Sequence, residues 1–253
     1  MKHLPNILTL ANLFSGCIAI AFILNAQPFV NEINGQQYWV NTVPQAYYAS
    51  LFIFFAAIFD LFDGMAARWL KVFSPIGKDL DSFADLVSFG VAPAMILYKM
   101  LWAAYMSDPK AMDVSMLALI PAFILPCFSA LRLSIFNHSE ENHQYFIGVP
   151  TPAVGLLIAS FPLINLYNPF GIGFAMQNAI LIYIIIALLS WLMVCNLKLF
   201  TLKFSNFSIK KYWAQITWLA LSVIAIPLLK TLTVPFSFII YILLSFAYKP
   251  EKS

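Results

Sequence analysis

One short acidic stretch, residues 60–85, carries the side chains best suited to chemistry in this sequence. It contains five aspartates in a chain of which only 10% is charged, and these are Asp60, Asp63, Asp79, Asp81 and Asp85. The first two are three residues apart and the last two are four apart, so each pair would lie on one face of a helix. Two helices joined by a short turn would direct four carboxylates at one point. Because such anions repel each other, and because divalent cations bind carboxylate oxygens, the stretch predicts a divalent-metal site.

Small and basic residues follow the first pair of aspartates on the same expected helix. Gly64 and Ala67 would let a bulky ligand approach the backbone, and the guanidinium of Arg68 suits a phosphate. The alternatives are helix packing through the two small residues and a cytoplasmic anchor at Arg68. Asp79 is interpreted separately, as an acid in the first turn of the next helix. Carboxylates, an arginine and an accessible glycine together favour a diphosphate-binding site.

The composition predicts a polytopic integral membrane protein. The chain has 253 residues, 62% of them hydrophobic, and a mean hydropathy of +0.83, whereas soluble domains are roughly 45–50% apolar and about 25% charged. A net charge of +3 is too small to argue for a nucleic-acid partner. Cys17, Cys127 and Cys195 all fall in apolar runs without a CxxC pair, as buried packing thiols do.

Apolar windows of about 20 residues mark the elements that must position the acidic stretch. We expect an all-α bundle of about eight transmembrane helices, at 7–24, 46–68, 80–103, 114–136, 151–167, 179–198, 212–229 and 232–248. The last two are separated by little more than Lys230 and Thr231 and would form a helical hairpin. A signal peptide is the alternative for the first run, but its length and its recurring polar residues favour a retained helix.

The basic residues predict the orientation. With a cytoplasmic N-terminus, 11 of the 14 lysines and arginines fall on inside segments and 3 on outside segments, the latter being Lys99, Lys110 and Lys230. This positive-inside bias places both termini and the acidic stretch at the cytoplasmic side of the cell (inner) membrane. The outside loop at about 25–45 is expected to be a connector without chemistry. The basic loop at 199–211 either touches anionic head groups or supplies orientation charges alone.

The acidic stretch resembles a family signature. The spacing D-x2-D-G-x2-A-R-x8-G-x3-D-x3-D is complete here in Asp60, Asp63, Gly64, Ala67, Arg68, Gly77, Asp81 and Asp85. It is similar to the signature of the CDP-alcohol phosphatidyltransferase family, which implies one membrane domain over 1–253, with accessory helices at about 179–248, and a homodimer. The resemblance implies that Asp60, Asp63 and Asp81 ligate Mg or Mn, and that Asp85 completes the site and acts as the catalytic base. It also implies that the nucleotide and diphosphate of a CDP-linked lipid contact Asp60, Gly64, Ala67, Arg68 and Gly77.

Two further stretches resemble the serine-transferring branch of that family. The first, PNILTLANLFSG, holds Asn6 and Thr9 about one turn apart, where both could face the cytidine; the alternative is polar residues at a helix entrance. The second is SALRLSIFN followed by FIGVPTPA, with Ser134 and Ile135 where many members have Ala and Arg. Arg132 could clasp a serine carboxylate with two bonds, with Asn137 and Thr151 near the amine or hydroxyl. The alternatives are a cytoplasmic anchor at Arg132 and a plain helix start at Pro150–Pro152.

The expected activity is transfer of a phosphatidyl group from CDP-diacylglycerol to the hydroxyl of L-serine, giving phosphatidylserine and CMP. Glycerol 3-phosphate or inositol phosphate as acceptor is the closest alternative, although either would need extra basic residues. A cation transporter would distribute its acids along a path through several helices. An inert scaffold would lack a signature carboxylate. His138, His143, Glu140 and Glu141 are interpreted as a solvated loop rather than a metal site.

Overall fold

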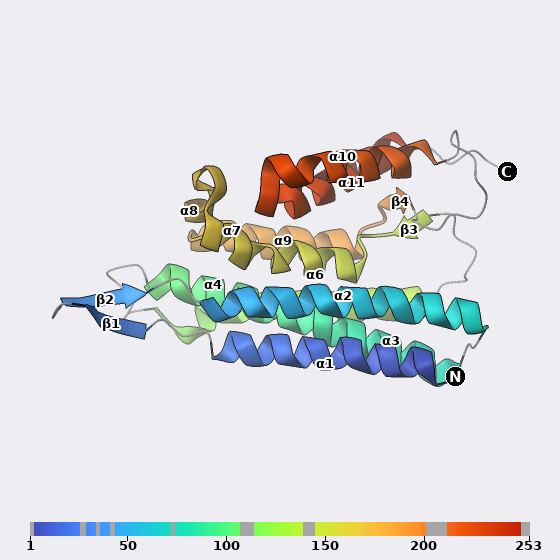
Figure 1. Ribbon diagram of the computed structural model, residues 1–253, viewed down its shortest axis with the longest axis horizontal. Coiled ribbons are helices and arrows are strands. Elements are labelled where there is room, and N and C mark those ends of the chain that lie inside the picture. The colour runs from blue at the N-terminus through green and yellow to red at the C-terminus, as the bar shows by residue number, and fades with distance from the viewer. Residues whose placement is uncertain are drawn as a thin grey trace.

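A computed structural model describes residues 3–25, 29–33, 36–40, 44–71, 74–106, 114–138, 145–200 and 212–248. Its long helices run along the longest axis of the molecule (Figure 1). The elements that carry the acidic stretch and its surroundings are α1 (Leu4–Leu24), α2 (Pro44–Leu70), α3 (Pro75–Asp85), η1 (Leu86–Val91) and α4 (Ala92–Met106). The rest of the bundle comprises η3 (Met116–Phe123), α5 (Ile124–His138), α6 (Thr151–Ala159), α7 (Phe161–Tyr167), η4 (Pro169–Gly171), α8 (Ile172–Ala175), α9 (Ala179–Val194), α10 (Trp213–Leu229), η5 (Lys230–Leu232) and α11 (Thr233–Ala247).

Five helical segments of the described chain are long and apolar enough to cross a membrane, and these are Leu4–Leu24, Gln45–Leu70, Pro75–Met106, Met116–His138 and Trp213–Ala247. Two shorter apolar helices, Thr151–Tyr167 and Ala179–Val194, accompany them. The chain reverses at η5, so α10 and α11 pack side by side as the expected hairpin. The protein is therefore an all-α integral membrane protein. The count of eight crossings and the side on which the termini lie stay predictions.

The start of α3 corrects one expectation. Ser74 caps this helix by accepting a hydrogen bond from the backbone N–H of Gly77 at 3.0 Å, and Pro75 occupies its first position. Serine is a favoured cap, and proline suits the first turn because it needs no N–H partner there. The helix thus begins before residue 80, and Asp79 lies exposed beyond its first turn. The first-turn role for Asp79 was wrong.

A single π-helical turn, η1, follows Asp85 directly and continues into α4. It packs unusually close to α1, because a Cβ on Gly16 would lie 2.9 Å from the Cα of Ser88. The hydroxyl of Ser88 also donates a 3.0 Å hydrogen bond to the carbonyl of Asn12. Turns of this type are rare and concentrate at functional sites. The contact ties the N-terminal helix to the segment that follows the last signature aspartate.

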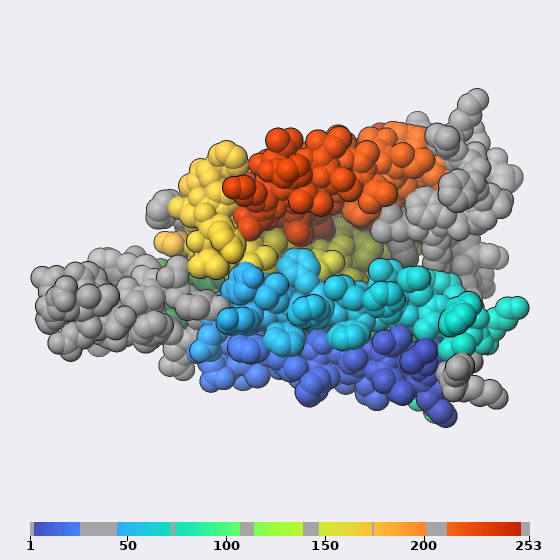
Figure 2. All heavy atoms as spheres, viewed as in Figure 1, coloured from blue at the N-terminus to red at the C-terminus, as the bar shows by residue number. Residues whose placement is uncertain are grey.

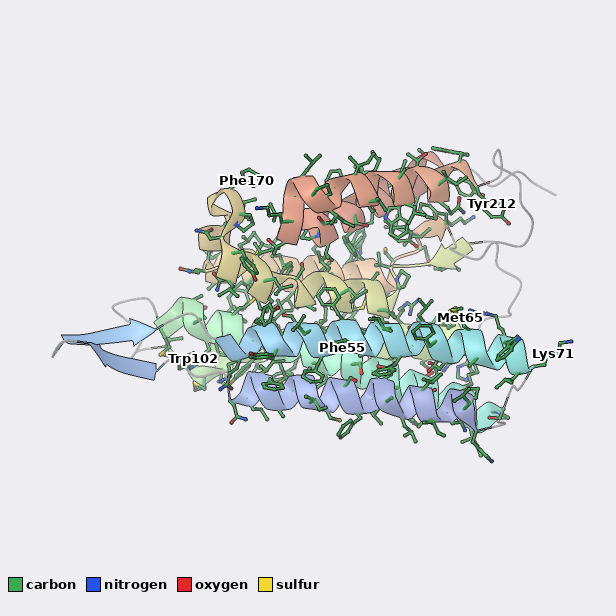
Figure 3. All side chains as sticks on the ribbon, viewed as in Figure 1. Phe55, Met65, Lys71, Trp102, Phe170 and Tyr212 are labelled. Atoms are coloured by element: carbon green, nitrogen blue, oxygen red, sulfur yellow. The ribbon has the colours of Figure 1, made fainter. Side chains whose placement is uncertain are left out.

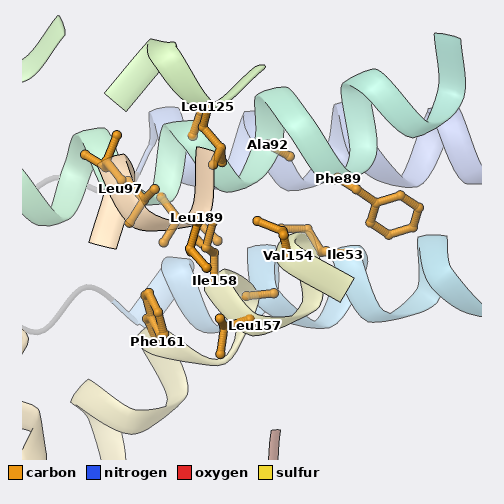
Figure 4. Close-up of a cluster of buried hydrophobic side chains, with 14 of the residues drawn as sticks. Ile53, Phe89, Ala92, Leu97, Leu125, Val154, Leu157, Ile158, Phe161 and Leu189 are labelled. Atoms are coloured by element: carbon orange, nitrogen blue, oxygen red, sulfur yellow. The ribbon is translucent and has the colours of Figure 1, made fainter. Parts of the chain in front are cut away.

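The hydrophobic core lies where η1, α4, α5, α6, α7 and α9 meet α2 (Figure 4). Its side chains include Phe89, Leu125 and Ile158, each essentially inaccessible to solvent. Gly155 permits this packing, because a Cβ there would lie 2.8 Å from the Cβ of Phe89. Close contact between helices through small residues is typical of membrane bundles. The core therefore packs α6 tightly against η1, the turn that directly follows Asp85 of the acidic stretch.

Two short antiparallel ladders add to the helices and were not predicted. β1 (Phe29–Ile33) pairs with β2 (Gln36–Val40), and β3 (Tyr145–Ile147) pairs with β4 (Lys198–Phe200). They lie at opposite ends of the bundle, with β3–β4 at the end where α1 begins (Figure 1).

Several of the expected loops contain a strand or a helix end, and others lie outside the described residues. The connector at about 25–45 contains the β1–β2 hairpin, and α9 ends at Val194 before β4. His138 closes α5 instead of lying in a loop. His143, Glu140, Glu141 and most of 199–211 lie outside the described residues.

The surface is hollowed on one side. Figure 2 shows a depression between α2 and the α10–α11 hairpin, with α6 beneath it. Both α2 and α11 contact α6, so the three elements form its walls and floor. This hollow, which we call the apolar flank of the bundle, runs between α2 and the α10–α11 hairpin towards the end that carries the acidic stretch.

Candidate functional site

Three of the predicted aspartates converge between α2 and α3. One carboxylate oxygen from each of Asp60, Asp63 and Asp81 lies within 4.8 Å of the others. Asp63 is buried at 6% exposure, and the other two are half-buried. The helical spacing directs Asp60 and Asp63 along one side of α2, and α1 packs against both α2 and α3.

This group suits a hard divalent cation. Oxygens bound to one Mg²⁺ or Ca²⁺ ion lie at most about 4–5 Å apart, twice the ion–oxygen distance. The three aspartate oxygens lie within 4.8 Å of one another, which is inside the span for Ca²⁺ and close to the span of about 4.2 Å for Mg²⁺. The donors are carboxylates alone, which hard metals prefer. An ion would also offset the repulsion between partly desolvated anions.

Asp85 lies beside this group but does not belong to it. It closes α3 and is 8% exposed. Its charge interacts with those of Asp60 and Asp81, and also with that of Arg132 on α5. Among the predicted carboxylates of the described chain, Asp85 is the one that faces a buried cation. A position between the acidic group and an arginine suits a proton acceptor more than a simple ligand.

The N-terminal helix contributes two buried polar side chains. Thr9 lies 2.7 Å from Oδ2 of Asp63, to which its hydroxyl can donate, and Asn12 donates through Nδ2 to Asp85 at 3.5 Å. The expected role of Thr9 towards the cytidine stays a prediction, and its contact here is with an aspartate. Asn12 had no predicted role. The available signal was its spacing, three residues after Thr9 and six after Asn6, which continues one helical face.

The remaining nucleotide candidates lie nearer the end of the bundle. Oδ1 of Asn6 is 3.3 Å from the position that a Cβ on Gly77 would take. The guanidinium of Arg68 lies over Gly64, its Nη1 being 3.6 Å from a Cβ built there. Arg68 is exposed, whereas Asn6, Gly64, Ala67 and Gly77 are half-buried. These residues come from α1, α2 and α3, close to the end of α2 that Lys71 marks in Figure 3.

A buried arginine, Arg132 of α5, lies near Asp85. Arg132 is 7% exposed and donates through Nη1 to the hydroxyl of Thr151 at 3.2 Å. Its guanidinium lies 5.6 Å from the ring centroid of Phe136. Its Nε has no hydrogen-bond partner in the described part of the chain. The structure thus brings Arg132 and Thr151 together next to Asp85.

Asn137 contacts two residues of α3, and its predicted place near the serine amine or hydroxyl stays a prediction. Its Nδ2 donates to the hydroxyl of Ser82 at 2.7 Å, and its carbonyl accepts from Nζ of Lys78 at 2.8 Å. Both partners belong to α3, and Ser82 adjoins Asp81. Asn137 therefore links the end of α5 to the helix that carries the second pair of signature aspartates.

The Gly16 contact supports this geometry and can be tested. We expect Gly16→Ala to destabilise the protein by about 1–3 kcal/mol, the usual cost of overpacking, because the new Cβ would meet the Ser88 backbone. Moving α1 would also separate Asn12 from Asp85 and lower activity. Thermal unfolding in detergent measures the first effect. Cys17→Ala, at the exposed neighbouring position, is the control, and equal stability of both variants would contradict the prediction.

Comparisons with known proteins agree with this site. The family model described as CDP-alcohol phosphatidyltransferase matches residues 2–191. The chain is 36% identical to a CDP-diacylglycerol–serine O-phosphatidyltransferase of Bacillus subtilis over 200 residues, covering 78% of this chain and 90% of that protein. A Helicobacter pylori protein of the same name is 31% identical over 219 residues, covering 86% and 80%. One from Methanocaldococcus jannaschii is 43% identical over 116 residues, covering 46% and 51%. The chain belongs to the CDP-alcohol phosphatidyltransferase family.

Proposed function

We propose that the protein transfers the phosphatidyl group of CDP-diacylglycerol to the hydroxyl of L-serine, giving phosphatidylserine and CMP. The observation that carries the proposal is the convergence of Asp60, Asp63 and Asp81 beside the interacting pair Asp85 and Arg132. The relatives named as CDP-diacylglycerol–serine O-phosphatidyltransferases support the same donor and acceptor.

Members of this family are in general dependent on divalent metal, and the three-aspartate group could bind one. We assign Mg or Mn to it, held by Asp60, Asp63 and Asp81, with Asp85 as the fourth carboxylate that completes the site. A bound ion of this kind neutralises charge on diphosphate oxygens and on the departing CMP. The carboxylates themselves fix where the diphosphate can lie, at the junction of α2 and α3.

Asp85 has the surroundings of a general base. Its carboxylate would accept the proton of the serine hydroxyl as that oxygen attacks the phosphorus bearing the diacylglycerol. The bond from that phosphorus to the CMP oxygen then breaks, and CMP leaves. Asn12 holds one oxygen of Asp85 from α1, which limits the rotation of the carboxylate. The buried position excludes bulk water, which would otherwise compete with serine for the donor.

The acceptor side is assigned to Arg132, Thr151 and Asn137. A guanidinium can bind a carboxylate with two parallel hydrogen bonds. Thr151 occupies one nitrogen, Nη1, and Nε has no hydrogen-bond partner among the described residues. Thr151 would therefore orient the arginine, and Asn137 would act through Ser82 on α3.

The nucleotide side is assigned to residues of the first three helices. They are Asn6, Thr9, Asp60, Gly64, Ala67, Arg68 and Gly77. Arg68 and Asn6 have the polar groups that can reach a phosphate or a base. Thr9 would contribute through its contact with Asp63. Gly64 and Gly77 leave space beside those two side chains.

The placement in the membrane is also a proposal. The exposed cations Arg68, Lys71 and Lys78 lie on the helices that carry the site, near its end of the bundle. Lys99 packs over Trp102, a residue near the opposite end (Figure 3). This distribution supports an active site that faces the cytoplasm from the inner membrane, with both termini on that side. The donor lipid would then approach along the apolar flank.

The domain organisation and assembly state follow from the resemblance. We assign one catalytic membrane domain to 1–253, with α9, α10 and α11 as accessory helices. The family model ends at residue 191, so it includes most of α9 but neither α10 nor α11. A homodimer is proposed on the family resemblance alone.

Two observations weigh against the alternatives. Glycerol 3-phosphate or inositol phosphate carries a phosphate, yet Arg132 is the one buried cation among the described residues. A single guanidinium suits a zwitterion such as serine better. For a cation transporter, acids should continue through the bundle, but α9 and α10 carry none. The buried acids of the described chain are Asp63 and Asp85, both at one level.

The test uses the purified full-length protein with CDP-diacylglycerol and, in turn, labelled serine, glycerol 3-phosphate and inositol phosphate. We expect CMP release with serine alone. EDTA should abolish the release, and added Mg²⁺ or Mn²⁺ should restore it, because the aspartate group requires a counter-ion. Release with a different acceptor only would contradict the acceptor assignment. Turnover that persists in EDTA would contradict the metal site.

A further inference from the structure

Tyr241 of the C-terminal hairpin is buried against Phe200 of β4. It is 7% exposed, although Trp213–Ala247, the segment that includes α11, is the least buried of the five candidate membrane spans. It lies near enough to Arg132 for the charge of each group to influence the other. The family model ends at residue 191, so this contact comes from a part of the chain that the family match does not cover.

The hydroxyl of Tyr241 is hydrogen-bonded to the backbone of β4. It donates to the carbonyl of Phe200 at 3.1 Å, and the two rings meet edge to face at 4.8 Å. Ser245, one turn later on α11, accepts from the backbone N–H of Phe200 at 3.4 Å and donates to the carbonyl of Tyr241 at 2.7 Å. Two side chains of α11 therefore hold the same backbone unit of β4 from both of its polar groups.

The β3–β4 ladder continues this connection towards Arg132. Ile147 pairs with Lys198, and the N–H of Gly148 donates to the carbonyl of Leu197 at 2.9 Å. Gly148 has φ +71, and a Cβ there would collide with the carbonyl of Met193, so the chain turns tightly at this point. Thr151 opens α6 three residues later and accepts the hydrogen bond of Arg132.

We infer that Tyr241 is a positioning residue that holds Arg132 for the serine carboxylate through β4, β3 and Thr151. The inference rests on the proposed function, in which Arg132 binds the acceptor. The β3–β4 ladder, held by α11, fixes the start of α6, and Thr151 at that start accepts the hydrogen bond that orients Arg132. The C-terminal hairpin would therefore influence the affinity for serine but not the affinity for CDP-diacylglycerol.

The decisive variant is Tyr241→Phe, which removes one oxygen and keeps the ring packed on Phe200. We expect the KM for serine to rise roughly 2- to 10-fold, the equivalent of one lost hydrogen bond. The KM for CDP-diacylglycerol should not change, because α2 and α3 are untouched. Tyr183→Phe is the matched control, since its hydroxyl bonds Tyr105 at 2.8 Å on other helices, and both KM values should stay at wild type.

Two further measurements keep the inference falsifiable. Ser245→Ala weakens the same hold on β4, so it should raise the KM for serine even if Tyr241→Phe does not fold. In an Arg132→Lys background, Tyr241→Phe should add nothing to the KM for serine, because the two residues act as one unit. Unchanged serine KM, equal changes for both substrates, or additivity with Arg132→Lys would overturn the inference alone. Absence of serine-dependent CMP release by the wild type would overturn the proposed function, and the inference with it.

Discussion

Asp85→Asn is expected to lower turnover by about 10²–10⁴-fold, the usual contribution of a general base. An amide of nearly equal size keeps the contact with Asn12 but cannot accept the proton of the acceptor hydroxyl. Binding of CDP-diacylglycerol should persist, because the Asp60, Asp63 and Asp81 group is intact. Initial rates of CMP release and equilibrium binding of the nucleotide separate the two effects.

The matched control is Asp79→Asn on the same helix. Asp79 is exposed whereas Asp85 is buried, so the identical chemical change is made in water. Its turnover should remain within about twofold of wild type, as surface substitutions usually have small effects. Unchanged turnover in Asp85→Asn would remove the base from the mechanism. Equal losses in both variants would indicate a general electrostatic effect.

Arg132→Gln is expected to produce the second large effect, a loss of kcat/KM for serine without a change in the KM for CDP-diacylglycerol. A hydrogen bond to a charged group is worth about 1.5–3 kcal/mol, so each lost bond to the serine carboxylate should cost roughly 10- to 100-fold in kcat/KM. Arg132→Lys keeps the charge but loses the planar fork, and should fall between Gln and wild type. Steady-state kinetics at saturating CDP-diacylglycerol measure these values.

Lys99→Gln supplies the comparison for this charge removal. Lys99 is half-buried and lies beside Trp102, away from the aspartates. Its kcat/KM for serine should match wild type. If Arg132→Gln raised the KM for CDP-diacylglycerol as much as that for serine, Arg132 would be a structural anchor and not the acceptor ligand. Thermal unfolding of each variant shows whether the loss of a buried charge has destabilised the fold.

The chemistry of the acidic stretch could be predicted from local rules. Helical periodicity alone aligns Asp60 with Asp63, and it requires only that two helices face each other across a turn. Hydropathy likewise predicted the membrane-embedded helices and the hairpin around Lys230. Pro150 and Pro152 correctly marked the start of α6. Such features depend on residues within one or two helical turns, which a sequence displays directly.

Boundaries and ladders were less predictable. The third helix was expected to begin at residue 80, whereas Ser74 and Pro75 begin α3. Serine and proline occur both in turns and at helix starts, so their presence does not distinguish the two. The β3–β4 pairing joins segments about fifty residues apart. Short strands such as these carry too few residues for a recognisable alternation. Their existence depends on α11 holding β4 in place.

The sequence by itself determined the kind of protein, the metal-binding aspartates as candidates and the family, since these depend on composition and close spacing. The tertiary structure decided which other side chains meet that group. It placed Asn12 against Asp85 across 73 positions and Tyr241 against Phe200 across 41. It also turned Asn137 towards Ser82. Contacts of this range depend on how helices pack, and a helix with an apolar surface all round shows no preferred face in its sequence.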